Sequence, residues 1–321
     1  MDISVVIPVY NEAKVLHALA DRLLPLMEST NCSWEVVFVN DGSADRTWEL
    51  LQDLRKKEPR ISLINLSRNF GHQLAITAGM DHALGDAVIV MDADLQDPPE
   101  VLHEMIARWR DGYDVVYGVR TERREETLFK KVSAAAFYRL LDLMTPISIP
   151  VDTGDFRLLS RRAIEALRRM PERARYVRGM VAWVGFKQIG VEFQRDARHA
   201  GETKYPFRKM VSFALDGMIS FSAVPLRIAT SIGFLMAGAT LLYFFYALVM
   251  KVAVGTTIQG WTSLIAVVVF IGSTQLLCLG IIGEYVGRIY DEVKSRPLYL
   301  IDSLQQTPDA ATHSTGERGA Q

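Results

Sequence analysis

The sequence predicts an α/β domain with a mostly parallel sheet, followed by two helices that cross a membrane. Apolar, β-branched runs alternate with helical patterns over residues 1–120, as in sheets covered on both faces. Residues 228–250 and 262–283 contain no charged side chain. Polar clusters follow the strands at the positions where parallel sheets bind their ligands.

Five runs have the composition of buried strands, and four helical patterns lie between them. The predicted strands are residues 3–10, 34–41, 61–67, 87–94 and 114–120. The predicted helices lie near residues 13–29, 45–57, 72–84 and 99–110. Residues 128–193 follow no regular pattern. We expect residues 1–206 to form one cytoplasmic domain.

The two uncharged segments are long enough to cross the hydrocarbon core of a bilayer, which is about 30 Å thick. Residues 228–250 and 262–283 are therefore predicted to be transmembrane helices, with an external loop at 251–261. A pair of buried helices in a soluble core is less favoured, because such helices nearly always carry a charged face.

Basic residues near the two segments predict the orientation, because such residues favour the cytoplasmic side. They precede the first segment and follow the second: Arg208, Lys209, Arg227, Arg288, Lys294 and Arg296. The N-terminal residues lack the pattern of a signal peptide. We expect a multi-pass protein of the inner (plasma) membrane with both termini in the cytoplasm.

Three further segments complete the predicted organisation. Residues 207–227 mix basic and apolar side chains and are predicted to form an interfacial amphipathic helix. Residues 284–304 are predicted to form a second interfacial helix and an exit segment. The polar residues 305–321 are predicted to be a disordered tail.

Charge and cysteine content exclude other classes of protein. The formal net charge of −1 argues against a nucleic-acid-binding protein that relies on overall positive charge. Cys32 and Cys278 lie far apart in the sequence, which argues against a disulfide framework or a cysteine-based metal site.

Polar clusters at successive strand ends predict one shared binding site of the nucleotide type. The clusters are residues 11–12, 40–47, 67–72, 92–97 and Arg120. Any one cluster could be an ordinary turn or helix cap, but the strand ends of a parallel sheet meet at one edge. His72 and His199 are interpreted as structural, because neither has a partner at ligand spacing.

Asp92 and Asp94 have the spacing of a site for a divalent cation. Side chains at i and i+2 of an extended strand point the same way, so the two carboxylates can address one ion. Oxygen ligands suit Mg²⁺ or Mn²⁺, which need only one or two protein carboxylates when phosphates supply the rest. Asp97 is interpreted as the N-cap of the helix that begins near Pro98.

Four motifs together resemble the family 2 inverting glycosyltransferases of the GT-A fold. The motifs are VVIPVYNE (5–12), VNDGSADRT (39–47), DADLQDPP (92–99) and GDFRL (154–158). With RHAGETKY (198–205) and the two C-terminal spans, the chain resembles the polyprenyl-phosphate branch. That branch includes dolichyl-phosphate mannose synthases and the bactoprenol glucosyltransferases of O-antigen modification, which the chain resembles most.

The resemblance implies a role for each matching residue. The residues that match the family's nucleotide-sugar-binding positions are Pro8, Tyr10, Asn11, Glu12, Asp41 and Asp92, and Asp41 would bind the base. The residues that match its metal-binding positions are Asp94 and Gln96 together with Asp92, and Asp155 matches the catalytic carboxylate. The candidates for binding the acceptor phosphate are Arg120, Lys131, Arg198, Thr203 and Lys204, although the family often has Arg at the position of Lys131.

The implied reaction transfers one hexose, with inversion, from UDP-glucose to undecaprenyl phosphate with Mg²⁺ or Mn²⁺. A phosphate monoester has a second pKa near 6 and needs little deprotonation, so we expect Asp155 mainly to orient substrates. Other donors (UDP-galactose, UDP-GlcNAc or GDP-mannose) stay open, as does a non-catalytic nucleotide-sugar-binding scaffold for a flippase. The resemblance also implies a homo-oligomer, a tetramer.

Overall fold

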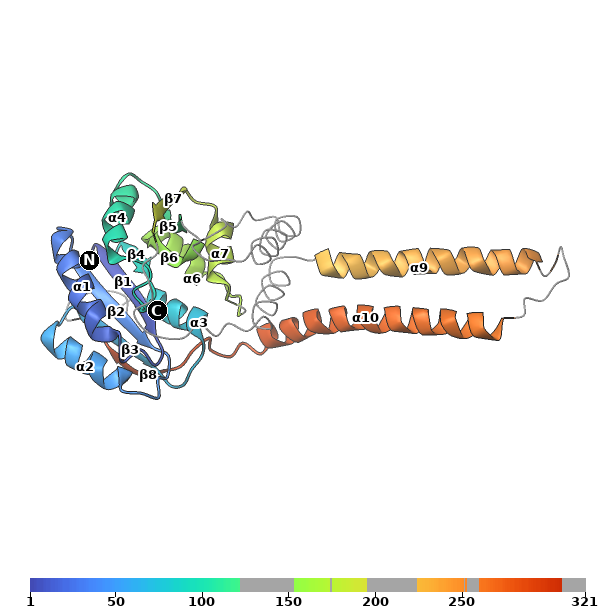
Figure 1. Ribbon diagram of the computed structural model, residues 1–321, viewed down its shortest axis with the longest axis horizontal. Coiled ribbons are helices and arrows are strands. Elements are labelled where there is room, and N and C mark those ends of the chain that lie inside the picture. Colours follow the sequence, from blue (N-terminus) through green and yellow to red (C-terminus); the bar gives the residue numbers. More distant parts are fainter. Residues whose placement is uncertain (122–152, 174, 195–223, 251, 253–259, 308–321) are drawn as a thin grey trace, which may run out of the picture. The chain divides into compact units, whose positions relative to one another are not determined.

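The computed structural model describes residues 1–121, 153–173, 175–194, 224–250, 252 and 260–307 (Figure 1). In chain order the elements are β1 (Ile3–Val9), α1 (Leu16–Ser29), β2 (Trp34–Asn40), α2 (Thr47–Lys57), β3 (Ile61–Leu66), α3 (His72–His82), β4 (Ala87–Val90), the 3₁₀ helix η1 (Pro99–Val101), α4 (Leu102–Arg110), β5 (Val115–Arg120), β6 (Thr153–Ser160), α6 (Arg161–Arg168), α7 (Val177–Val184), β7 (Gln188–Phe193), α9 (Val224–Val249), α10 (Trp261–Val293) and β8 (Ile301–Gln305).

Within the described residues, eight strands form one sheet in the order β7-β5-β6-β4-β1-β2-β3-β8. The neighbours β4, β1, β2 and β3 run parallel, and β5 runs parallel to β7. β6 is antiparallel to both β4 and β5, and β8 is antiparallel to β3. The mostly parallel sheet predicted from the sequence is therefore present, with two antiparallel strands that the sequence patterns do not reveal.

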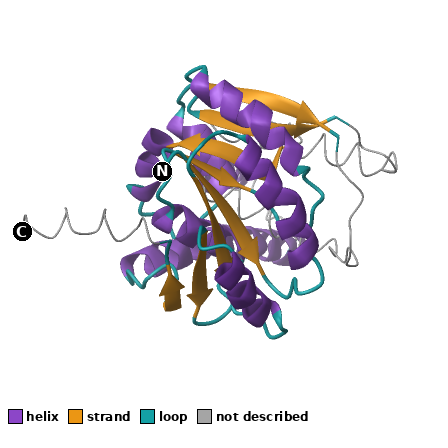
Figure 2. Cartoon of the chain, turned by 90° about the vertical axis from the view of Figure 1, so that its left-hand side faces the viewer, coloured by secondary structure: helices purple, strands orange, loops and turns teal. Residues whose placement is uncertain are grey.

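Helices cover both faces of the sheet (Figure 2). On one face, the side chains of Ile3, Val5, Ile7 and Val9 of β1 join a buried cluster with residues of α1, α2 and α4. On the other face α3 packs closely, since a Cβ added at Gly79 would lie 2.2 Å from Cγ1 of Val6. All seven residues of β1 and of β2 are buried, which explains their continuous apolar runs.

The described residues divide into two compact units. Residues up to 194 and from 296 form the α/β unit, and residues 224–295 form the second unit. In the second unit α9 and α10 pack against each other. Leu226–Tyr246 and Val267–Val293 are long and apolar enough to cross a membrane, with mean hydropathy 1.8 each. Residues 284–293 continue α10 without a break.

Two local structures differ from the sequence expectations. β4 ends at Val90 rather than at Asp94, and the chain turns farther on, at Leu95, whose φ is 57°. Residues 301–305, expected to lie in an exit segment and tail, form the strand β8 at the sheet edge. Residues 207–223 of the predicted interfacial helix and residues 308–321 of the tail lie outside the described part of the chain.

Candidate active site

The sheet brings the polar strand ends to one edge. β1, β2, β3 and β4 run parallel and end there. β6 runs the opposite way, so its beginning lies at this edge and carries Asp155. β5 is antiparallel to β6, which places its last residue, Arg120, at the same edge. The residues singled out in the sequence are thus neighbours in the fold.

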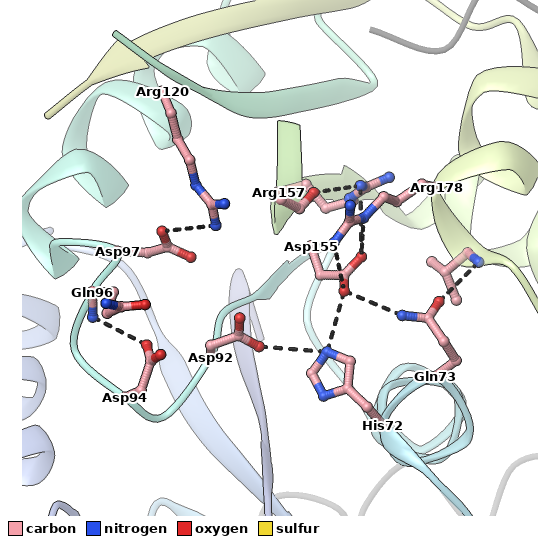
Figure 3. Close-up of polar contacts among 12 residues, drawn as sticks. His72, Gln73, Asp92, Asp94, Gln96, Asp97, Arg120, Asp155, Arg157 and Arg178 are labelled. Carbon is pink, nitrogen blue, oxygen red and sulfur yellow. Dashed lines mark hydrogen bonds and ion pairs between the residues drawn. The ribbon is translucent and has the colours of Figure 1, made fainter. Parts of the chain in front are cut away.

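The Asp155 carboxylate lies among four polar side chains from α3, β6 and α7 (Figure 3). Arg178 donates from Nε to Oδ1 at 2.8 Å and from Nη2 to Oδ2 at 3.3 Å. Gln73 Nε2 donates to Oδ2 at 3.1 Å, and His72 Nε2 lies 3.2 Å from the same oxygen. Nη2 of Arg157 lies 4.0 Å from Oδ1. We call these five residues the Asp155 cluster.

The Asp155 cluster keeps its carboxylate ionised. Burial alone would raise the pKa of Asp155, which is 5% exposed. The hydrogen bond from His72 and the charges of Arg178 and Arg157 outweigh burial and hold the pKa well below its ordinary range. A carboxylate with so low a pKa accepts protons poorly at neutral pH. This supports an orienting role for Asp155 over general-base catalysis.

His72 joins the Asp155 cluster to the loop after β4. Its Nε2 lies 3.5 Å from Oδ1 of Asp92 as well as 3.2 Å from Oδ2 of Asp155. Burial lowers the pKa of His72, but the hydrogen bond to Asp155 and the charge of Asp92 raise it more. The premise of the structural interpretation, that His72 has no partner, is therefore wrong, since its side chain contacts two candidate functional carboxylates. A structural role for His72 stays a prediction.

The loop after β4 presents Asp92, Asp94 and Gln96 on one side. These three residues are half-buried, whereas Ala93 and Leu95 between them are only 4% and 5% exposed. Oδ1 of Asp94 accepts a hydrogen bond from the backbone N–H of Gln96 at 3.1 Å. Burial thus continues to alternate beyond β4, although the strand has ended and residues 93–94 lie in a turn.

The Asp92 side of this loop fits a divalent cation. Burial first, then the charges of Asp155 and Asp94, raise the pKa of Asp92, and a cation would relieve this repulsion. Among the described residues no three His, Cys, Asp or Glu side chains form a complete metal site. Mg²⁺ and Mn²⁺ do not require one, because a diphosphate and water can complete an oxygen shell begun by two carboxylates.

Asp97 and Arg120 pair beside this loop. Asp97 is 1% exposed, and its Oδ1 accepts from Nη2 of Arg120 at 3.5 Å. Pro98 rather than Asp97 occupies the N-cap position of η1, so the expected capping role of Asp97 is wrong. A Cβ added at Gly154 would lie 2.7 Å from Nη2 of Arg120, so the glycine leaves room for the guanidinium. Arg120 stays 27% exposed and accessible to a ligand.

The predicted nucleotide residues lie at the ends of β1 and β2. Pro8 is buried within β1, and Tyr10 is 49% exposed just beyond it. Asn11 has φ 58°, and its backbone N–H donates to Oγ of Ser43 at 2.9 Å. The backbone N–H of Glu12 donates to Oγ1 of Thr47 at 2.9 Å. These contacts join the loop after β1 to the loop after β2.

Asp41 joins the loop after β2 to the loop after β3. Its two carboxylate oxygens accept from the backbone N–H groups of Phe70 at 2.7 Å and Gly71 at 2.9 Å. Burial raises the pKa of Asp41 more than these two hydrogen bonds lower it. A carboxylate has about four acceptor positions, so these two hydrogen bonds use only part of the accepting capacity of Asp41, which is 3% exposed.

Gly42 permits this contact, and its replacement by alanine is expected to damage the loop. Gly42 has φ 68°, and an added Cβ would lie 2.5 Å from backbone atoms of Arg68 and Asn69. We expect Gly42→Ala to destabilise the fold by about 2–4 kcal/mol, from left-handed strain plus the clash. The unfolding temperature, measured by calorimetry, should fall because the added Cβ forces the two loops apart.

Gly112→Ala is the matched control for this prediction. Gly112 also has a positive φ, 85°, but a Cβ there meets nothing within 4 Å. Gly112→Ala therefore introduces the backbone strain without the clash, so the difference between the two variants measures the effect of the clash. Equal losses of thermal stability in the two variants would contradict the assigned role of Gly42.

Sequence reasoning assigned no functional role to the other members of the Asp155 cluster. His72 lies in the polar cluster 67–72, and Arg157 lies within the motif GDFRL (154–158), so these two could have been identified by position. No sequence signal marks Arg178, which lies on α7 in the stretch without a regular pattern. The predicted phosphate-binding residues Lys131, Arg198, Thr203 and Lys204 lie outside the described residues, as does His199.

Two family models match the chain. Residues 4–168 match the model described as glycosyl transferase family 2, and residues 224–289 match the GtrB C-terminal hairpin. The first match spans the sheet edge described above, from β1 to the start of β6 and beyond. The second spans α9 and most of α10.

Named relatives agree with these matches. An uncharacterised glycosyltransferase of Bacillus subtilis, YkcC, is 54% identical over 93% of this chain and 92% of its own length. The SfII prophage-derived bactoprenol glucosyl transferase of Shigella flexneri is 39% identical over 94% of this chain and 97% of its own. The solved structure of glucosyl-3-phosphoglycerate synthase from Mycobacterium tuberculosis with Mn²⁺ and UDP is 18% identical, with a TM-score of 0.45 over 67% of this chain and 76% of that one.

Proposed function

Because this chain belongs to glycosyltransferase family 2 and carries the GtrB C-terminal hairpin, we propose that it transfers one hexose from a nucleotide diphosphate sugar to a polyprenyl phosphate. UDP-glucose and undecaprenyl phosphate are the proposed substrates, since a 39% identical relative is a bactoprenol glucosyl transferase. The reaction would take place on the cytoplasmic face of the membrane, and the product would be a polyprenyl-phosphate hexose of inverted configuration.

The observation that carries this proposal is that two groups of charged side chains meet at the edge of the sheet where the strands end. Asp92 and Asp94 offer oxygen ligands on one side, and the Asp155 cluster lies on the other, with His72 contacting both Asp92 and Asp155. A cation held by Asp92 and Asp94 would neutralise the charge of a donor diphosphate. The Asp155 cluster would supply the fixed polar groups that the reacting sugar carbon needs.

Bond making and breaking occur at the anomeric carbon. An oxygen of the lipid phosphate forms the new C–O bond from the face opposite the nucleotide, and the bond to the diphosphate breaks, releasing UDP. The lipid phosphate is largely dianionic at neutral pH, so no proton has to be removed first. Asp155 would instead hold His72 and Arg178 in fixed positions around the reacting sugar.

The charges of both substrates would be met by named residues. When bound at Asp92, Asp94 and Gln96, Mg²⁺ or Mn²⁺ supplies electrostatic stabilisation of the leaving diphosphate. Tyr10, Asn11, Glu12 and Asp41 would hold the nucleotide, with Pro8 shaping β1 beneath them. Cationic and hydroxyl groups would hold the acceptor phosphate, and the candidates are Arg120, Lys131, Arg198, Thr203 and Lys204.

A donor panel tests the proposed function. Purified protein in detergent is mixed with undecaprenyl phosphate, Mn²⁺ and, in separate reactions, UDP-glucose, UDP-galactose, UDP-GlcNAc or GDP-mannose. We expect a glycolipid whose mass corresponds to one added hexose with UDP-glucose. Product with another donor alone would correct the sugar, and absence of product with all four would favour the scaffold.

A further inference from the structure

The C-terminal strand β8 contains one residue more than its partner β3 at the point where they pair. Asn65 lies opposite Ser303 and the next residue, Leu66, lies opposite Ile301, so Asp302 is the extra residue of a β-bulge. Bulges redirect side chains. Here Oδ2 of Asp302 accepts a hydrogen bond from Nδ2 of Asn65 at 3.0 Å.

Further hydrogen bonds continue from Asn65 to the loop after β2. Nδ2 of Asn40, the last residue of β2, donates to Oδ1 of Asn65 at 2.7 Å. Oδ1 of Asn40 accepts from the backbone N–H of Ser43 at 3.3 Å. Oγ of Ser43 accepts from the backbone N–H of Asn11 at 2.9 Å. Four hydrogen bonds thus lead from β8 to Asn11.

Asp302 gives this chain of hydrogen bonds its direction. An ionised carboxylate only accepts hydrogen bonds, so Asn65 must turn its amide nitrogen toward Asp302 and its oxygen toward Asn40. Asn40 then turns its own nitrogen toward Asn65 and its oxygen toward Ser43. Asn40 is 2% exposed, which leaves little water to satisfy its amide in the reversed orientation.

β8 is itself firmly attached to the α/β unit. The backbone N–H of Thr307 donates to Oγ of Ser62 at 3.1 Å, and that of Ser67 donates to the carbonyl of Leu300 at 2.9 Å. Thr307 is 3% exposed. Residues 294–300 join α10 to this strand.

We propose that β8 positions the donor site, with Asp302, Asn65 and Asn40 as positioning residues for the loop over residues 41–45. The loop carries Asp41 and holds Asn11 through Ser43. This inference rests on the proposed function, in which that loop binds the donor nucleotide. What is new is that the C-terminal strand β8 contributes to the affinity for the donor.

An exchange of amide and carboxylate tests the inference. Asn65→Asp places two carboxylates against each other and removes the donor to Asp302. We expect the KM for the donor to rise about 3-fold to 10-fold, with kcat little changed. Asn65→Asp combined with Asp302→Asn restores one donor and one acceptor at that contact and should return the KM close to its original value.

Controls separate this effect from a general loss of structure. Ser303→Ala changes the neighbouring residue of β8 and should leave the KM unchanged, and Asp302→Ala should raise it without altering Asn65. An unchanged donor KM in Asn65→Asp and Asp302→Ala, or no recovery in the double variant, would overturn the inference. Absence of turnover by the unmodified chain with every donor would instead overturn the proposed function on which it rests.

Discussion

Replacing Asp94 by alanine is expected to reduce glycolipid formation by about 1,000-fold, because a divalent ion on a leaving diphosphate contributes several kcal/mol. Asp94 is half-buried beside the more crowded Asp92, and its Oδ1 also fixes the backbone of Gln96. Alanine removes a cation ligand and this contact together. The measurement is transfer of labelled hexose from the nucleotide donor to undecaprenyl phosphate.

Asp111→Asn is the matched control for Asp94. Asp111 is exposed at the C-terminal end of α4, in the turn before β5, and therefore lies at the sheet edge opposite the site. It should retain full transfer. Chelation with EDTA should abolish transfer by the unmodified chain, and added Mg²⁺ or Mn²⁺ should restore it. Undiminished transfer by a correctly folded Asp94→Ala variant would contradict the assigned role.

Asp155→Asn is expected to lower kcat by about 100-fold or more, because it leaves the Asp155 cluster without its central negative charge. The amide that replaces one oxygen would meet the donors of Arg178, Gln73 or His72, which contact the present carboxylate at 2.8–3.3 Å. His72 and Arg178 would then lose their fixed positions.

Asp155→Asn should also lower the stability of the α/β unit. Removing one partner of a buried ion pair costs about 3–5 kcal/mol. The pKa of Asp155 lies below its ordinary value of 3.8, so the carboxylate stabilises the fold above that pH and loses this contribution as the pH falls below it. The stability difference between the two proteins should therefore shrink under acid conditions, as thermal unfolding at several pH values can show.

The pH dependence of transfer distinguishes orientation from base catalysis. We expect the rate to fall below about pH 6, where the acceptor phosphate gains a proton. Asp155→Asn should keep this dependence at a lower plateau, since the pKa of Asp155 lies far below that range. Loss of the acid limb in Asp155→Asn would mean that Asp155 is the titrating base.

The strand ends could be predicted because the evidence for them is local. Each run of apolar residues predicts a buried strand, and parallel strands share an edge. Asp41, Asp92 and Asp94 were located in this way, and the fold that holds them is confirmed. Asp155 was found through a family motif, since β6 lies within a stretch with no regular pattern.

Contacts between segments far apart in the sequence could not be predicted from sequence patterns. His72 bonds to Asp155, 83 residues away, and Arg178 reaches Asp155 from a helix that has no distinctive motif. β8 returns to β3 after the candidate membrane helices, although its residues were expected to belong to an exit segment and the first residue of a tail. The residue pattern of a strand does not show which distant strand it pairs with.

The most direct test of the proposed metal–diphosphate site is Mn²⁺ binding in the presence of UDP, followed by electron paramagnetic resonance. The unmodified chain should bind one Mn²⁺ and bind it more tightly when UDP is added, because the diphosphate completes its oxygen shell. Asp94→Ala should lose this UDP-dependent binding. Equal UDP-dependent binding of Mn²⁺ by the variant and the unmodified chain would contradict a site built on the loop after β4.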